Sequence, residues 1–365
     1  METHKMHQKP TIFSFFSGVG ILDLGFERAG FHIEYVNEFN AAFLDAYKYA
    51  RKKLNIKEPK FGYFNGDIRD ALHSPIKEQI LEYMKKTQKN SLIGFIGGPP
   101  CPDFSIGGKN KGENGENGVL TSAYKDVIME FTPDFFVFEN VKGLLRTKKH
   151  KVFYEKIKNE LSEKYLLTDR LTNSIEFGVP QDRDRIFLFG INKKLNMDLS
   201  KFNWNKFITV NKKEALDKSI WPSYQGSVND IEIKNWQKKL TVEYWFKKND
   251  VINHPNSKNH FIPRQGLSKF KSILEGDVSK KSYKKLHRKR YSPTAAYGNN
   301  EVHIHPTLPR RISAAEAMAI QSLPKEFELP QHMSLTNIFK TIGNGVPFLA
   351  SYMLAKTIMD FIDNQ

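Results

Sequence analysis

Cysteine is almost absent from the chain, and its scarcity excludes two kinds of protein. Cys101 is the only cysteine among 365 residues. A single thiol cannot form an intramolecular disulfide, so the sequence indicates a reducing compartment. A zinc site with four cysteine ligands is excluded too. We interpret the close pair His303 and His305 as structural because no cysteine accompanies it, and we expect no metal.

Long apolar segments are also lacking. The first ten residues are polar and contain no apolar region of a signal peptide. No stretch approaches the roughly 18 consecutive apolar residues of a membrane-spanning helix. The sequence therefore predicts a soluble, cytoplasmic protein, which we expect to be a monomer.

Acidic residues are outnumbered, because 56 Lys and Arg face 40 Asp and Glu, which gives a formal net charge of +16. Such an excess favours a polyanionic partner, since Lys and Arg that neutralise phosphates release counterions. A solvated Lys-rich surface would explain the same charge. The charge therefore only makes nucleic acid a candidate partner.

Short apolar runs alternate with longer helical patterns through residues 1–191, which predicts an α/β domain with a mostly parallel sheet. We expect strands at 11–16, 33–37, 92–96, 135–138 and 185–191, and helices at 21–29, 41–53 and 122–131. Residues 192–315 are rich in Asn, Lys, Trp and Tyr and show little periodicity, so we expect a smaller, irregular domain there. Helical periodicity returns at 312–321. We expect a hinge at 316–342, and a return to the first domain at 343–365 that includes a helix at 347–362. The Gly- and Asn-rich segment 107–118 is expected to be a loop.

A glycine turn follows the first expected strand, in the sequence Phe16-Ser17-Gly18-Val19-Gly20. Such turns let a nucleotide-like ligand approach the backbone at the carboxyl ends of the strands. Asp23 occupies the third glycine position of a dinucleotide fingerprint, which argues against a nicotinamide oxidoreductase. A plain strand–helix connection remains the alternative.

Carboxylates and aromatic rings follow the turn. Glu38 could accept hydrogen bonds from ribose hydroxyls, and Asp67 could accept one from an exocyclic amine. Each acid could equally be a residue at a helix start. Phe16 and Phe39 could pack against an adenine ring or, as single Phe residues more often do, into the core.

The only thiol lies at the end of an expected strand, between Pro100 and Pro102. An inert cysteine would be expected within an apolar face, so we interpret Cys101 as reactive. Glu139 ends another strand at the same edge. Further on, alternate residues of an extended segment face one side, so Gln181, Arg183 and Arg185 can act together. Surface ion pairs with Asp182 and Asp184 are the alternative.

These groups suit attack on an electron-poor heteroaromatic ring such as cytosine. Addition of the Cys101 thiolate to C6 would make C5 nucleophilic, which divides one difficult step into easier ones. Glu139 would hold and protonate N3, which requires a carboxyl pKa raised by burial. Arg183 would hold the oxygen at C2, where negative charge develops.

These blocks, in this order, resemble the bacterial DNA cytosine-C5 methyltransferase family over nearly the whole chain. Further blocks that resemble it are Pro100-Cys101 with Phe104-Ser105, Glu139-Asn140-Val141, the set Arg311, Glu316, Gln321 and Pro324, and Gly343-Asn344-Gly345-Val346-Pro347. The resemblance implies a Rossmann-like methyltransferase fold with a target recognition domain at 192–315. It implies S-adenosylmethionine as the methyl donor and a specific double-stranded DNA sequence as the substrate.

The resemblance also implies roles for single residues. Asn140 would orient the nucleophile loop, Arg185 would join the catalytic set, and residues 102–118 would help to extrude the cytosine. Leu120 and Asn344 would contact the donor. The full set expected at the donor is Phe16, Gly18, Gly20, Glu38, Phe39, Asp67, Ile68, Pro99, Leu120 and Asn344. The modification enzyme of a restriction–modification system is implied, so a restriction endonuclease is a possible partner in the same system.

DNA contacts are expected from both domains. The basic stretch from Lys280 to Arg290 predicts a phosphate-binding surface, with a solvated basic face as the alternative. The residues expected at DNA are Ser105, Gln181, Lys284, Lys285, Arg288 and Arg290. A tRNA methyltransferase of the same fold and an inert DNA-binding relative remain alternative functions.

Overall fold

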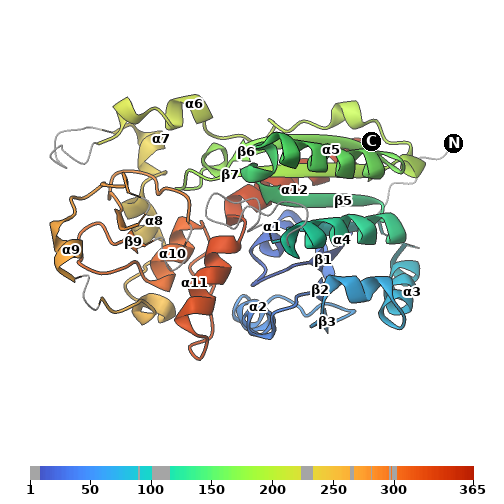
Figure 1. Ribbon diagram of the computed structural model, residues 1–365, viewed down its shortest axis with the longest axis horizontal. Coiled ribbons are helices and arrows are strands. Elements are labelled where there is room, and N and C mark those ends of the chain that lie inside the picture. Colours follow the sequence, from blue (N-terminus) through green and yellow to red (C-terminus); the bar gives the residue numbers. More distant parts are fainter. Residues whose placement is uncertain are drawn as a thin grey trace.

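The computed structural model describes residues 9–88, 91–100, 116–222, 233–263, 267–280, 282–295, 297 and 302–365. A seven-stranded sheet forms the centre of the protein (Figure 1). The strands lie in the order β3-β2-β1-β4-β5-β7-β6. Their bounds are β1 Thr11–Phe15, β2 His32–Asn37, β3 Tyr63–Phe64, β4 Ile93–Gly97, β5 Phe135–Val141, β6 Tyr165–Asn173 and β7 Asp184–Asn192. All neighbouring strands are parallel except that β7 runs antiparallel to β5 and β6. The expected mostly parallel α/β class is confirmed.

The antiparallel strand β7 positions the reacting groups. In its ladder with β5, Val141 lies opposite Arg185 and Glu139 lies opposite Phe187. The carboxyl end of β5 therefore meets the amino end of β7. The sequence analysis missed β6 because this edge strand is only partly buried and shows no clear alternation of apolar residues.

Helices cover both faces of the sheet. The cluster that includes Phe95 and Phe138 packs against α3 Ile76–Gln88, α4 Glu116–Phe131 and α5 Lys148–Ser162. The cluster that includes Val137 and Phe189 packs against α1 Ile21–Ala29, α2 Ala41–Lys53 and α12 Phe348–Asp363 on the other face. The protein is thus a three-layer α/β structure.

Local sequence signals explain most helix ends. Asn40 caps α2 by accepting hydrogen bonds from the N–H groups of Ala42 and Phe43, and α2 has the predicted bounds. Helix α12 begins at Phe348, with Pro347 preceding it as the cap residue. Helix α4 begins at residue 116, so residues 116–118 of the expected loop are helical, and residues 107–115 lie outside the described part.

Shorter elements gather at one end of the molecule, opposite the end where the C-terminus lies in Figure 1. They are α6 Lys212–Ala215, α7 Asn235–Lys238, α8 Val242–Lys248, α9 Leu267–Ser272, β8 Lys284–Lys285, β9 His303–Ile304, α10 Ala314–Ile320 and α11 Leu335–Asn344. Within the described residues the 3₁₀ helices are η1 Ile68–Leu72, η3 Lys142–Leu145, η4 Ser174–Phe177, η5 Lys193–Leu195, η6 Leu199–Lys201, η7 Lys218–Ile220 and η8 Pro255–Lys258.

One apolar cluster joins this end to the sheet domain. It contains Ile21 of α1 and Phe43 of α2 together with Met318 of α10 and Ile338 of α11. The segment from Leu195 to Ile208 also packs against the sheet domain's second cluster. The proposed boundary at 191/192 and the proposed hinge at 316–342 therefore lie within closely packed parts of the chain.

The stretch Leu335–Asp363 is long and apolar enough, by length and composition, for a membrane span, and half of its apolar window is buried. It consists of α11 and α12, separated around Gly345–Pro347. Gly25 of α1 has no side chain where α12 approaches, since a Cβ there would lie 2.2 Å from the Ser351 hydroxyl oxygen. We interpret α12 as a core helix.

Candidate active site

The glycine turn after β1 is held by a buried carboxylate at the end of β2. Glu38 Oε2 accepts a hydrogen bond from the Gly18 N–H at 2.8 Å, and Oε1 accepts one from the Asn40 N–H at 2.8 Å. Burial raises the pKa of this carboxyl, although the backbone N–H groups act in the opposite direction. Glu38 is thus fixed at the strand ends, with lone pairs left for ligand hydroxyls.

Phe39, the next residue, is 73% exposed. Asn65 steadies this backbone by donating to the Glu38 and Phe39 carbonyls at 2.8 and 2.9 Å. The ring does not enter the core, so the core-packing alternative for Phe39 is wrong. An exposed flat ring beside a fixed carboxylate is a suitable surface for a purine.

Asp67 lies at the start of η1, where both carboxylate oxygens bind the Arg69 side chain at 2.9 and 2.7 Å. These bonds lower the pKa of Asp67. Asp67 also caps the start of η1, because its Oδ1 accepts a hydrogen bond from the Arg69 N–H. The alternative that Asp67 is a helix-start residue therefore describes its contacts in this structure. An exocyclic amine would share this carboxylate with Arg69.

The last expected motif, Gly343–Pro347, lies close to the glycine turn after β1. Gly345 packs on Ile21, where a Cβ would lie 2.6 Å from Cδ1, and a Cβ on Gly18 would lie 3.7 Å from Thr341 Oγ1. Asn344 is exposed at the end of α11. The other residues expected at the donor are Phe16, half-buried against Tyr124; Ile68 and Pro99, both buried; and Leu120, half-buried on α4.

Arg51 binds the main chain of the glycine turn. The sequence analysis missed this residue. Its buried guanidinium donates to the Val19 and Gly20 carbonyls at 3.4 and 2.7 Å, and it pairs with Glu27 at 3.1 Å. Its position in the last turn of α2 gave no sequence signal, because the glycine turn lies about 30 residues earlier.

Gly20→Ala is expected to destabilise the protein by about 1–3 kcal/mol more than Gly62→Ala. Both glycines have a φ of 77°, so both variants carry the same backbone strain. A Cβ at Gly20 would lie 2.4 Å from the Tyr47 ring, whereas nothing lies within 4 Å of one at Gly62. Urea unfolding of both variants measures the difference. Equal losses of stability would contradict tight packing at Gly20.

Cys101 and Ser105 lie outside the described residues, but the strand that leads to Cys101 is defined. β4 ends at Gly97 beside Phe138 of β5. A Cβ on Gly98 would lie 2.6 Å from Glu139 Oε2, so the backbone that approaches Cys101 passes directly against the Glu139 carboxyl group. Only glycine allows so close an approach.

Glu139 and Arg185 form a buried pair at this edge. The Arg185 Nε lies 2.9 Å from Glu139 Oε1, and the two side chains are 13% and 9% exposed. Burial raises the pKa of Glu139 against the opposing effect of Arg185 and Arg183. This direction is the one that protonation of N3 by Glu139 would require.

The expectation that Arg183 holds the base oxygen needs correction. Arg183 is fully buried, and its guanidinium donates to the carbonyls of Ala295 at 3.0 Å, Gly343 at 2.8 Å and Asn344 at 3.4 Å. Its terminal nitrogens are thus occupied by main chain. Arg185, two residues further on, is the guanidinium that lies beside Glu139. The surface ion-pair alternative is also wrong for Arg183.

Asn140 is buried, and its side-chain amide nitrogen is available to donate a hydrogen bond. Its Oδ1 accepts from the Val141 N–H at 2.8 Å, while Nδ2 has no partner among the described residues. A free amide donor beside the β4 end fits the expected role of orienting the segment around Cys101.

Gln181 does not present a side chain to DNA in this structure. It is fully buried, its Oε1 accepts from the Ala295 N–H at 3.1 Å, and its Nε2 donates to Gln321 Oε1 at 3.3 Å. Gln321 in turn donates to the Ile342 carbonyl at 2.6 Å. Gln181 therefore joins the sheet domain to residues of the second half of the chain.

Comparison with known proteins now decides the family. Residues 11–360 match the C-5 cytosine-specific DNA methylase family. The chain belongs to this family. It is 56% identical over 360 residues to the type II methyltransferase M.NmeDI of Neisseria meningitidis serogroup C, covering 98% of this chain and 85% of that relative. It is 29% identical to the type II methyltransferase M.FnuDI of Fusobacterium nucleatum, covering 97% and 95%.

Solved structures agree on the fold of this DNA methylase. A DNA modification methyltransferase encoded within an E. coli prophage superimposes with a TM-score of 0.67 at 22% identity, covering 98% of this chain and 100% of that one. Spodoptera frugiperda DNMT2 gives a TM-score of 0.59 at 16% identity, covering 96% and 100%. The expected Rossmann-like fold of S-adenosylmethionine-dependent methyltransferases is confirmed.

In this DNA methylase, several charged side chains of the basic stretch from Lys280 to Arg290 bind groups within the protein itself. Lys285 Nζ donates to the carbonyls of Phe270 and Ile273 at 3.4 and 3.0 Å. Arg288 binds both oxygens of Glu275 at 3.0 Å, and Arg290 donates to the Pro222 carbonyl at 3.2 Å. Lys284 lies half-buried in β8. The stretch is therefore not a simple row of free phosphate ligands.

Arg288→Gln is expected to change the salt dependence of DNA binding by well under one unit in the slope of log K against log salt. A phosphate contact contributes about 0.9 to that slope, but Glu275 already neutralises this guanidinium. Filter binding at several salt concentrations measures the slope. A decrease near 0.9 would show that Arg288 leaves Glu275 for a phosphate.

Proposed function

We propose that this DNA methylase transfers a methyl group from S-adenosylmethionine to C5 of a cytosine in a specific double-stranded DNA sequence, and that it is the modification enzyme of a type II restriction–modification system. The observation that carries the chemistry is the buried Glu139–Arg185 pair, which lies directly against the Gly98 backbone that leads to Cys101. The names of M.NmeDI and M.FnuDI support the biological context.

The residues at the strand ends fit the proposed donor. The fixed Glu38 carboxylate suits ribose hydroxyls, the exposed Phe39 ring suits adenine, and Asn344 lies at the end of α11 beside the glycine turn. Phe16, Gly18, Gly20, Asp67, Ile68, Pro99 and Leu120 complete the proposed donor site. When bound, the donor supplies an electrophilic methyl group. We found no cluster of three or more His, Cys, Asp or Glu arranged to hold a metal among the described residues.

The chain's own groups would act on the cytosine ring. The Cys101 thiolate adds to C6 and forms an Sγ–C6 bond, while Glu139 provides the proton at N3, so that electron density reaches C5. Arg185, in place of Arg183, faces the C2 oxygen and holds the Glu139 carboxyl. Once C5 carries the methyl group, a water molecule acting as base takes the C5 proton, the C5=C6 double bond re-forms as the Sγ–C6 bond breaks and returns the thiolate, and the N3 proton goes back to the Glu139 carboxylate. The target base must leave the helix for this attack.

The alternative functions are less favoured. Membership of a DNA methylase family argues against a tRNA substrate, and the low-identity likeness to DNMT2 shows the fold alone. An inert relative would have no need to retain a buried Glu–Arg pair together with Cys101. We propose a monomer that acts in the cytoplasm, with a restriction endonuclease acting separately on the same DNA sequence.

Bisulfite sequencing of DNA from a bacterial host free of its own cytosine-C5 methylation tests the proposal. Expression of the protein should protect one cytosine within a recurring sequence from conversion, and an empty vector should protect none. Methyl transfer by the purified protein to bulk tRNA, with no protected cytosine in DNA, would contradict it.

A further inference from the structure

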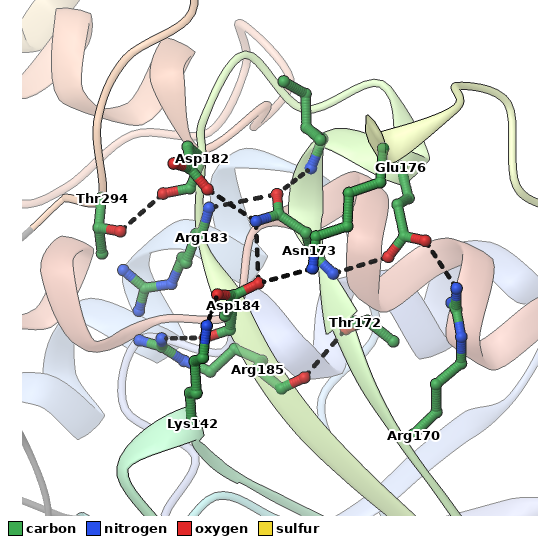
Figure 2. Close-up of polar contacts among 12 residues, drawn as sticks. Lys142, Arg170, Thr172, Asn173, Glu176, Asp182, Arg183, Asp184, Arg185 and Thr294 are labelled. Carbon is green, nitrogen blue, oxygen red and sulfur yellow. Dashed lines mark hydrogen bonds and ion pairs between the residues drawn. The ribbon is translucent and has the colours of Figure 1, made fainter. Parts of the chain in front are cut away.

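A buried asparagine organises the segment that carries the arginines (Figure 2). Asn173 is fully buried at the end of β6, where it pairs with Asp184, the first residue of β7. The chain between them forms η4 and then the Gln181–Arg183 segment. Asn173 thus lies at both ends of the loop that delivers Arg183 and Arg185.

The Asn173 amide bridges two carboxylates. Its Nδ2 donates to Asp182 Oδ1 at 2.7 Å and to Asp184 Oδ1 at 3.0 Å. Its Oδ1 accepts from the Ile175 N–H at 3.1 Å and from the Arg183 N–H at 3.4 Å. All four hydrogen-bonding positions of the amide are therefore used.

The two bridged aspartates connect the loop to the reacting pair and to the second half of the chain. The Asp184 carbonyl accepts from Arg185 Nη1 at 2.8 Å, and the Asp184 carboxylate binds Lys142 at 2.9 Å and Lys212 at 3.1 Å. The Asp182 carbonyl accepts from the Thr294 hydroxyl at 2.6 Å. Lys142 itself follows β5, the strand of Glu139.

Two like charges this close repel each other unless a donor lies between them. Only an amide offers two N–H donors on one nitrogen together with an acceptor for the Ile175 and Arg183 N–H groups. An aspartate of the same shape would keep the acceptor and replace both donors with a third negative charge. The position therefore needs asparagine for its donors, beyond its role as a helix cap.

We propose that Asn173 is a positioning residue for methyl transfer: by bridging Asp182 and Asp184 it fixes the start of β7 and so places the Arg185 guanidinium against Glu139. The inference rests on the proposed function of the Glu139–Arg185 pair. A shift of about 1 Å in a reacting group can cost on the order of a hundredfold in rate. Asn173 is fully buried, so in this proposal it acts through the residues that it contacts.

Asn173→Asp and Asn173→Ser separate positioning from capping, because Asp and Ser both cap helices well. The matched control is Asn192→Asp at the opposite end of β7. Asn192 is also buried, caps η5 through the Lys194 N–H, and donates to the Pro133 carbonyl at 3.3 Å. Each variant is assayed for kcat, for KM for DNA and donor, and for the rate of adduct formation with DNA containing 5-fluorocytosine.

In Asn173→Asp we expect kcat and the adduct rate to fall together by about 10- to 100-fold, while both KM values stay within about twofold of wild type. Asn192→Asp should keep its wild-type kcat. Should Asn173→Asp fail to fold, Asn173→Ser gives the same comparison with the cap retained. Wild-type kcat in the folded Asn173 variants, or an equal loss in Asn192→Asp, would overturn the inference. Absence of the adduct in wild type would instead overturn the proposed function.

Discussion

In the Cys101→Ser variant, methyl transfer is expected to fall by more than about 10⁴-fold, while DNA and donor binding stay within a few-fold of wild type. A serine hydroxyl is a far weaker nucleophile than a thiolate at neutral pH. Cys101 is the only cysteine, so no second thiol of the chain can replace it. Transfer of labelled methyl groups to DNA measures the rate, and calorimetry measures the binding.

DNA with 5-fluorocytosine at the target position provides the direct control. Fluorine cannot leave C5 as a proton does, so the wild-type protein should remain attached to the DNA through Cys101, and the serine variant should not. Near wild-type transfer by Cys101→Ser would contradict the covalent mechanism.

Glu139→Gln is expected to lower kcat by about 10²- to 10⁴-fold, the usual contribution of a positioned general acid. Glutamine preserves the shape beside Gly98 and Arg185 but cannot supply the proton to N3. Because burial raises the pKa of Glu139, the protonated carboxyl persists to higher pH than an exposed one would. Wild-type kcat should fall as pH rises through that raised pKa, and the variant should lose this dependence.

Glu27→Gln is the matched control for that variant. Glu27 is also a buried carboxyl paired with an arginine, Arg51, and burial raises its pKa to about 7. Glu27 lies on α1, the helix that follows the glycine turn. At saturating donor we expect Glu27→Gln to retain kcat. A comparable loss of kcat in both variants would show that breaking any buried Glu–Arg pair suffices, and Glu139 would lose its catalytic role.

Sequence motifs predict the reacting residues, but they do not predict which of the two arginines lies beside Glu139. Alternation along an extended chain predicts that Arg183 and Arg185 act together, but their guanidinium groups have different partners. Which of them lies beside Glu139 depends on the antiparallel register of β5 and β7, where Arg185 opposes Val141 and is therefore a diagonal neighbour of Glu139. Arg183 lies just before this ladder and reaches Ala295 and Gly343 instead.

The basic stretch from Lys280 to Arg290 shows the same limit of prediction from the sequence. Lys285, Arg288 and Arg290 resemble free cations in the sequence, yet their partners are Glu275 and main-chain carbonyls that lie elsewhere in the fold. The asparagine at 173 was overlooked because an Asn followed three residues later by Glu176 indicates only a helix cap. Its contacts with Asp182 and Asp184 form only when β6 pairs with β7.

The sequence by itself determined the family, the α/β class and the glycine turn, and it predicts a reacting set of Cys101, Glu139 and an arginine, because these depend on residue types at short, fixed spacings. Tertiary structure alone decided which arginine pairs with Glu139, which cations of the basic stretch bind groups within the protein, and that α1 shares one apolar cluster with α12 and another with α11. These outcomes depend on strand register and on charge pairing between residues that lie far apart in the chain, and local spacing does not encode such contacts.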